Sequence, residues 1–212
     1  TMKIYPCVVV KTAELYRWWQ DGRYQPYDDE TLVELLIAMK QLVPPYVRIE
    51  RVIRDIPSTS IEAGCQFTNL REEVQRRMRA RGLRCCCIRC RQVRERADGT
   101  YAVVRRDYEA SEGREIFLSF EDQTANQLAA FLRLRIPSFV LRHTPNWWPV
   151  LDGAALIREL HTYGQHLALH DRTDDAVQHQ GFGRRLVAEA ERIAKEEYGL
   201  ARIVAIAGVG VR

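Results

Sequence analysis

The stretch VQHQGFGRRLVAEAERIAKEEYG, residues 177–199, places two glycines one residue apart directly before a long amphipathic segment. Its apolar residues recur at helical spacing and predict a helix with one buried face; they are Leu186, Val187, Ala190, Ile193 and Ala194. A helix begins with unpaired backbone N–H groups and a partial positive charge. Gly181 and Gly183 carry no side chain, so a phosphate could approach these groups closely.

An ordinary strand-to-helix turn also uses glycine, and a G-x-G pattern alone does not separate the two interpretations. The spacing Q-x-x-G-x-G, after an apolar strand predicted at 156–163, resembles the acyl-CoA loop of the GCN5-related N-acetyltransferase (GNAT) family. In that family the loop amides bind the pyrophosphate of coenzyme A, and the strand offers its backbone to the pantetheine arm. The resemblance implies an acetyl-CoA site made by Leu160, Gln178, Gln180, Gly181, Phe182, Gly183 and Arg184.

The chain has 212 residues, of which 46% are hydrophobic, so it can form one large domain or two small ones. No run of 18 apolar residues predicts a membrane span, and no signal peptide opens the chain. We therefore expect a cytoplasmic protein without a membrane partner. Both ends read like the interior of a domain, which suggests a piece of a longer protein.

The first third alternates strand and helix signals, which is typical of a parallel α/β sheet or barrel. Strands are predicted at 3–10 and 46–57. Helices are predicted at 12–22, 28–43 and 69–82, with Thr12, Asp28 or Asp29, and Asn69 as caps. From about Asp98 onward the runs alternate and are separated by turns, which predicts antiparallel strands and an α+β domain.

Four of the six cysteines lie within six residues, as CCCIRC from Cys85 to Cys90. The C-x-C-x-x-C spacing of Cys85, Cys87 and Cys90 can wrap one zinc ion, with the fourth ligand supplied from elsewhere. Cys86 points away from its neighbours if the segment is extended, so we expect it not to bind. The alternative is a set of buried free thiols.

Residues 71–96 contain ten arginines and no lysine, against three glutamates. Guanidinium groups pair with phosphate in a bidentate manner, so this block favours a phosphate-bearing partner such as RNA over a merely solvated helix face. The expected RNA-binding residues are Arg76, Arg77, Arg79, Arg81, Arg84, Arg89 and Arg91.

The order of these segments resembles the catalytic subunit family of Elongator. KIYPCVVVKTAELYRWWQDGRY and NLREEVQRRM are similar to the later part of its radical S-adenosylmethionine domain, and CCCIRCRQV is similar to its zinc-binding linker. ALIRELHTYG and QHQGFGRRLVAEAERIAKEEYG are similar to its acetyltransferase domain. The resemblance implies three parts: the end of a TIM-like radical domain at 1–82, a zinc linker at 83–97, and an incomplete GNAT domain at 98–212.

This resemblance implies an enzyme that modifies C5 of the wobble uridine of tRNA. It also implies four cofactors: acetyl-CoA, zinc, S-adenosylmethionine and a 4Fe-4S cluster. The methyl carbon of acetyl-CoA would join the uracil ring, and acetyl release would depend on RNA. Other Elongator-type subunits, or a second copy of the protein, are implied partners.

The sequence departs from the family pattern in three places. It lacks the spaced cysteine trio that holds the iron–sulfur cluster, and Cys7 and Cys65 are isolated. It ends soon after the GVG turn, before a segment that carries tyrosine in the family. It also carries the additional cysteine Cys86.

Glu159, His161 and Tyr163 share one face of the predicted strand by its period of two. We expect a lined pocket in which His161 or Tyr163 moves a proton; an outward-facing polar strand face is the alternative. Two other functions remain open: a protein or small-molecule N-acetyltransferase with an unrelated N-terminal domain, and a zinc-stabilised RNA-binding module without catalysis.

Overall fold

The computed structural model describes residues 1–53, 55–94, 99–145, 147–164, 181–205 and 207. They divide into two compact units, Thr1–Arg91 and Gln92–Arg212, each with its own hydrophobic core. The division falls inside the predicted linker at 83–97, so the cysteine cluster belongs to the first unit. None of the described helices is long and apolar enough to span a lipid bilayer.

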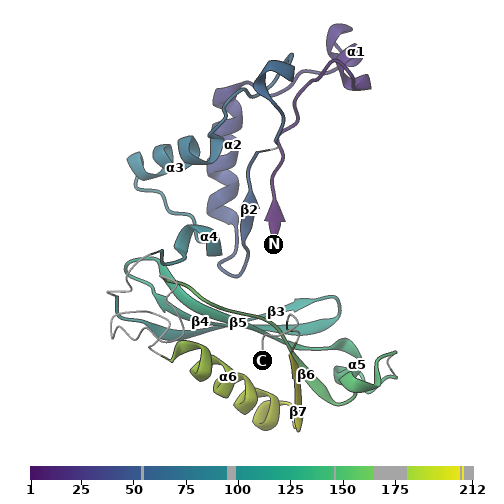
Figure 1. Cartoon of the computed structure of the whole chain (residues 1–212), viewed down its shortest axis with the longest axis vertical. Coiled ribbons are helices and arrows are strands. Elements are labelled where there is room, and N and C mark those ends of the chain that lie inside the picture. Colours follow the sequence, from purple (N-terminus) through teal and green to yellow (C-terminus); the bar gives the residue numbers. More distant parts are fainter. Residues whose placement is uncertain (54, 95–98, 146, 165–180, 206, 208–212) are drawn as a thin grey trace. The chain divides into compact units, whose positions relative to one another are not determined.

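The first unit packs helices around a short parallel pair of strands (Figure 1). Its strands are β1 (Met2–Lys3) and β2 (Ile49–Arg51), and its helices are α1 (Glu14–Gln20), α2 (Asp29–Leu42), η1 (Ser58–Ser60), α3 (Leu70–Ala80) and α4 (Ile88–Arg91). The helix α2 begins as predicted, because the Asp28 side chain accepts a hydrogen bond of 2.7 Å from the Thr31 amide. Its buried face and that of α3 form most of the core.

Several predicted boundaries in this unit are wrong. The strand expected at 3–10 ends at Lys3, and Val9 only bridges to Ala63; Pro6 lacks the N–H that a longer ladder would need. The strand expected at 46–57 is reduced to β2. Thr12 does not cap α1, since Ala13 occupies that position, and Asn69 precedes α3 without a side-chain capping bond.

The second unit is a five-stranded sheet in the order β3-β4-β5-β6-β7. Its strands are β3 (Ala102–Ala110), β4 (Gly113–Asp122), β5 (Gln127–Ile136), β6 (Ala154–Thr162) and β7 (Arg202–Ala205). The short helices α5 (Ser138–Leu141) and η2 (Pro149–Leu151) lie between β5 and β6. Neighbouring strands are antiparallel except β6 and β7, which run parallel because α6 (Phe182–Arg192) and η4 (Ile193–Glu197) lie between them in the sequence.

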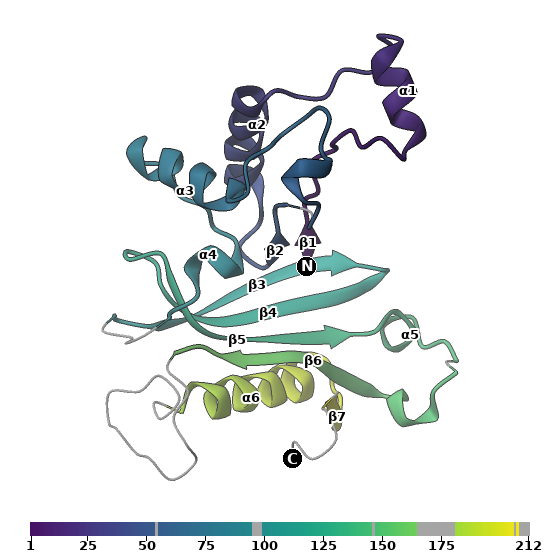
Figure 2. The same cartoon turned by 45° about the horizontal axis from the view of Figure 1, so that its top comes forward.

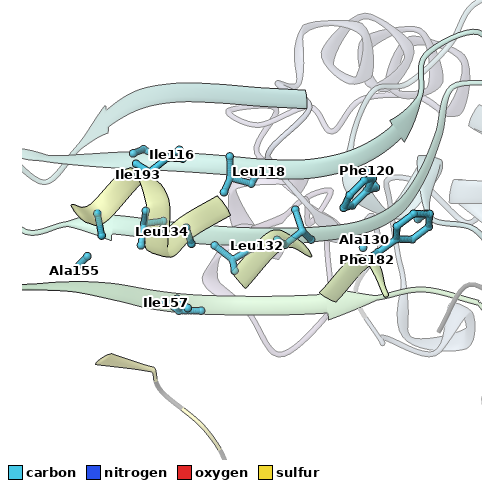
Figure 3. Packing of buried hydrophobic residues seen from close by; sticks show 14 of the residues in the cluster. Ile116, Leu118, Phe120, Ala130, Leu132, Leu134, Ala155, Ile157, Phe182 and Ile193 are labelled. Carbon is cyan, nitrogen blue, oxygen red and sulfur yellow. The ribbon is translucent and has the colours of Figure 1, made fainter. Parts of the chain in front are cut away.

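The helix α6 packs against one face of this sheet, as Figure 2 shows. Alternate residues of the central strands point toward it, as expected for the two-residue period of a strand. The buried cluster between sheet and helix includes the residues labelled in Figure 3: Ile116, Leu118, Phe120, Ala130, Leu132, Leu134, Ala155, Ile157, Phe182 and Ile193.

The strand β6 contains one extra residue relative to β5. Arg133 pairs with Glu159, whereas the next residue, Leu134, pairs with Ile157, so Arg158 is left as a bulge. On its other side β6 pairs with β7 only from Ala154 to Ile157. Among the described residues, the edge of β6 beyond the bulge therefore has no strand partner on the β7 side.

Candidate functional site

The first turn of α6 is fixed by one glycine and one aromatic ring. Gly181 precedes the helix with a φ of 68°, a left-handed conformation that favours glycine. The next side chain, Phe182, is buried and stacks on Phe120 with ring centroids 4.3 Å apart. Because its side chain lies in the core, Phe182 can offer a ligand only its backbone amide.

Gly183 lies inside the first turn and faces the end of β6. A β-carbon placed on it would meet the Thr162 methyl carbon at 3.5 Å, an ordinary contact distance. Its backbone has no positive φ, so neither conformation nor packing within the described chain requires glycine there. Arg184 follows as an exposed residue. The predicted Gln178 and Gln180 lie outside the described residues.

The partnerless edge of β6 ends beside this helix turn. Peptide groups from Arg158 onward can bond an extended ligand there, as a missing strand would. The predicted Leu160 lies on this segment, and its side chain is 41% exposed although it is apolar. The helix start and the strand edge together form an elongated surface with anion-binding character at one end.

The face of the sheet opposite α6 carries the three predicted proton-transfer residues. His161 Nε2 lies 3.1 Å from Glu159 Oε1, and the rings of His161 and Tyr163 are nearly parallel with centroids 6.1 Å apart. The bulge at Arg158 sets which β6 residues point to this face. The structure thus brings Glu159, His161 and Tyr163 together on one face, as the strand period predicts.

Two residues of β5 complete this group and were not predicted as site residues. Arg133 Nε donates to Glu159 Oε2 at 2.7 Å, and its guanidinium lies over the rings of Phe117 and Phe131. Phe131 also contacts the His161 ring, at a centroid distance of 5.3 Å. In the sequence, Arg133 stands out as a charged residue in the otherwise apolar run LAAFLRLRI, residues 128–136. The sequence does not show which strand pairs with this run, so the contact with Glu159 could not be predicted.

The cysteine cluster forms a compact group of sulfurs in the first unit. The Sγ atoms of Cys85, Cys87 and Cys90 all lie within 4.8 Å of one another, and Cys86 is not part of the group. Cys87 is fully buried, and α4 begins directly after it, which brings Cys90 back toward Cys87. Three thiolates at this separation suit a soft cation such as zinc.

Positively charged and amide side chains surround these sulfurs. Lys40 Nζ and Gln75 Nε2 donate to Cys90 Sγ at 3.5 and 3.4 Å. Hydrogen bonds from Cys85 and Cys87, together with the Lys40 charge, hold the pKa of the Cys90 thiol well below its usual range. Arg71 is also within electrostatic range of the cluster, and its Nη1 is buried without a hydrogen-bond partner among the described residues. Hydrogen bonds to Cys87 and Cys90 raise the pKa of the Cys85 thiol, so these surroundings place the negative charge of the cluster on Cys90.

The arginine block divides into residues that hold the fold and residues that face solvent. Arg77 pairs with Glu30 at 2.5 Å and Arg81 with Glu34 at 2.6 Å, which ties α3 to α2. Hydrogen bonds from Arg76 and Arg77 lower the pKa of Glu73 to about 2. The block therefore presents less unpaired positive charge than its composition suggests.

Arg91 corrects the predicted RNA-binding set. It is only 4% exposed, and it donates to the carbonyl oxygens of Cys86 and Pro45 at 2.7 and 2.8 Å. A guanidinium used in this way cannot reach an RNA phosphate. By contrast, Arg79, Arg84 and Arg89 are exposed, and Arg79 forms no ion pair with a described residue.

Comparisons with known proteins find relatives along the whole chain. The family described as Radical_SAM C-terminal domain matches residues 1–80. The chain is 44% identical over its whole length to a tRNA uridine(34) acetyltransferase of Dehalococcoides mccartyi, of which it covers 46%. It is 42% identical to Elongator complex protein 3 of Saccharomyces cerevisiae, of which it covers 39%.

A solved structure of an archaeal Elp3 from Methanocaldococcus infernus, with an N-terminal deletion, has a similar fold. It superimposes with a TM-score of 0.82 at 43% identity, over 99% of this chain and 50% of the other. The chain thus spans about half the length, or less, of the relatives it matches. The resemblance predicted from the sequence is confirmed: along its whole length, this chain is related to one part of the tRNA uridine(34) acetyltransferases and Elongator complex protein 3.

Proposed function

We propose that this chain supplies the acetyl-CoA site of an enzyme that modifies uridine 34 of tRNA. The names of relatives that are 40–44% identical over the whole chain support this proposal. The observation that carries it is the first turn of α6 beside the partnerless edge of β6. On this account the second unit is a GNAT acetyltransferase domain, and the first unit is the end of a radical S-adenosylmethionine domain.

Acetyl-CoA would lie along the surface formed by β6 and α6. The pyrophosphate would accept hydrogen bonds from the amides of the first turn of α6, near Gly181, Phe182 and Gly183, and the Arg184 charge would add to the attraction. The pantetheine amides would bond to the β6 edge, and Leu160 would contact the apolar part of the arm. A glycine inside a helix costs about 1 kcal/mol relative to alanine. Because nothing within the described chain requires Gly183, close approach of a ligand explains it.

Glu159 and His161 would handle the proton that accompanies acetyl release. With His161 Nε2–H donated to Glu159, the imidazole Nδ1 can accept a proton from the group that attacks the thioester. Arg133 would hold the Glu159 carboxylate in place, and Tyr163 lies beside His161 on the same face. These roles are part of the proposal and follow from the shared face.

Zinc would be held by Cys85, Cys87 and Cys90 as a structural ion. The sulfur separation, the burial and the neighbouring cations fit a centre of thiolates and a divalent metal. The ion would tie the segment after α3 to the core of the first unit, since metal-binding free energy becomes folding free energy. The described residues offer no fourth ligand of the usual kinds at this cluster.

The whole protein would also use S-adenosylmethionine and a 4Fe-4S cluster, which supply radical chemistry when bound. This chain lacks the spaced cysteines for such a cluster, so no step of that chemistry is assigned to its residues. Exposed arginines including Arg79, Arg84 and Arg89 would bind tRNA phosphates. Elongator-type subunits are proposed partners, and a cytoplasmic location follows from the proposed tRNA substrate.

Release of the acetyl group from acetyl-CoA by the whole protein, with and without tRNA, tests this function. We expect release that tRNA stimulates. Acetylation of free amines without tRNA would instead indicate an ordinary N-acetyltransferase. If the protein binds tRNA but neither binds nor cleaves acetyl-CoA, it is an RNA-binding module and the proposal fails.

A further inference from the structure

Lys40 is the one charged residue on the buried face of α2, among the residues that the structure describes. It is 0% exposed, whereas the other buried positions of this helix are apolar: Leu32, Val33, Leu36 and Ile37. An ammonium group without a partner is costly to remove from water. Its burial therefore requires a compensating group of negative charge or strong acceptor character.

The described residues provide no carboxylate within ion-pair distance of Lys40. Its Nζ instead donates to Cys90 Sγ at 3.5 Å. Gln75, on the neighbouring helix α3, donates to the same sulfur at 3.4 Å. Two donors from two different helices thus converge on one member of the cysteine cluster.

We propose that Lys40 and Gln75 form the outer shell of the metal site, as positioning residues for the ligand Cys90. This inference rests on the proposed zinc site and extends it. A divalent cation bound by three thiolates carries a net negative charge, which the buried Lys40 ammonium offsets. Gln75 fixes the direction of the Cys90 sulfur without adding charge.

Replacement of Lys40 by methionine separates a role at the metal site from a role in packing alone. A lysine that only filled the core could be replaced by methionine, which has similar length and no charge, at little cost. A lysine that balances a metal–thiolate centre has no such substitute when the metal is bound. The two roles therefore predict different outcomes for one substitution.

The test is a comparison of Lys40→Met with the wild type in the whole 212-residue chain. Zinc affinity is measured by competition with a chromogenic chelator, and thermal unfolding is measured with and without zinc. Lys40→Met should weaken zinc binding by about 10- to 100-fold, as loss of outer-shell partners typically does. The metal-free variant should unfold at the same temperature as the metal-free wild type, or higher.

Two further variants keep the test decisive. Gln75→Leu should also weaken zinc binding, by less than Lys40→Met, and Lys3→Met, at an exposed lysine, should not change it. In Co²⁺-substituted Lys40→Met and Gln75→Leu, the thiolate-to-cobalt absorption should keep its intensity, because all the cysteine ligands remain. Unchanged absorption distinguishes a weakened metal site from the loss of a cysteine ligand. If Lys40→Met does not fold, the zinc affinity of Gln75→Leu tests the inference in its place.

Equal zinc affinity in the wild type, Lys40→Met and Gln75→Leu would overturn the outer-shell inference and leave the metal site intact. A loss of thermal stability that is the same with and without zinc, at unchanged affinity, would show that Lys40 only packs the core. If the wild type itself binds no zinc, the proposed metal site fails and the inference fails with it.

Discussion

The two candidate sites offer a ligand different parts of the chain. The cysteine cluster uses side-chain sulfurs, two of them buried, inside the core of the first unit. The site at β6 and α6 uses backbone groups at a strand edge and a helix start in the second unit. One site depends on which side chains are present, and the other depends on which are absent.

This difference predicts opposite responses to mutation. At the cysteine cluster, removing one ligand atom should abolish metal binding, whereas changing Cys86, which is not part of the group, should leave it intact. At the start of α6, adding a side chain at Gly183 should block the ligand, and removing one should matter only where, as at Phe182, the side chain anchors the backbone.

Cys87→Ser should remove the metal. Serine is a poor zinc ligand, and a structural zinc contributes roughly 10 kcal/mol or more to folding of a small domain. Metal analysis should find about one zinc per chain in the wild type and almost none in this variant. Cys86→Ser is the matched control and should keep its zinc. If Cys86→Ser releases the metal and Cys87→Ser retains it, the ligand assignment is wrong.

Phe182→Ala should destabilise the second unit by about 3–5 kcal/mol, as large-to-small changes at buried aromatic residues do. The ring anchors the first turn of α6 by stacking on Phe120. Its loss should therefore weaken acetyl-CoA binding through a misplaced backbone, even though the side chain contacts no ligand. Val187→Ala, one turn further along α6, is the control, with a smaller loss of stability and retained binding. Normal affinity in a destabilised Phe182→Ala would break the link between this anchor and the site.

Arg91→Ala and Arg79→Ala should separate structural arginines from RNA-binding ones. Loss of Arg91 leaves two backbone carbonyls without their donor, which should cost about 1–3 kcal/mol of stability. Arg79→Ala should change stability by less than about 0.5 kcal/mol. It should weaken tRNA binding in a salt-dependent manner, because a phosphate contact is lost. Denaturant unfolding measures the stability of both variants, and filter binding at several salt concentrations measures their affinity for tRNA. Unchanged tRNA affinity in Arg79→Ala would show that Arg79 is not part of the RNA interface.

The sequence predicts local features of the fold better than long-range ones. The cap of α2, the helix α6 and the grouping of Cys85, Cys87 and Cys90 depend on residues close together in the chain, and their spacing predicts them. The bounds of β5 could not be predicted, because this strand lies in the middle of the sheet and is buried along most of its length, which hides the alternation. The bulge at Arg158 depends on pairing with a distant strand.

The candidate sites follow the same rule. Spacing predicts the grouping of the three cysteines but not the role of Lys40. A lysine in an amphipathic helix is expected to be exposed, and its burial depends on packing against residues distant in the sequence. It predicts that Glu159 and His161 share a face, but not that Arg133 joins them from β5. Composition predicts an arginine-rich surface, yet the burial of Arg91 depends on carbonyl groups distant in the sequence.

An acetyl-CoA titration of Gly183→Glu by calorimetry tests the proposed acetyl-CoA site at α6 and β6 most directly. A carboxylate in the first turn suits the helix dipole, and the position has room for a β-carbon, so the thermal midpoint should not fall. The same carboxylate would occupy the proposed pyrophosphate position and repel it. Affinity should drop by about 100-fold or more, because charge-assisted hydrogen bonds of about 1.5–3 kcal/mol each are lost.

Ala188→Glu is the matched control, since it adds the same charge to an exposed position of the same helix. We expect acetyl-CoA to bind the wild type and Ala188→Glu with similar affinity and not to bind Gly183→Glu measurably. A folded Gly183→Glu protein that binds acetyl-CoA as tightly as the wild type would contradict the account.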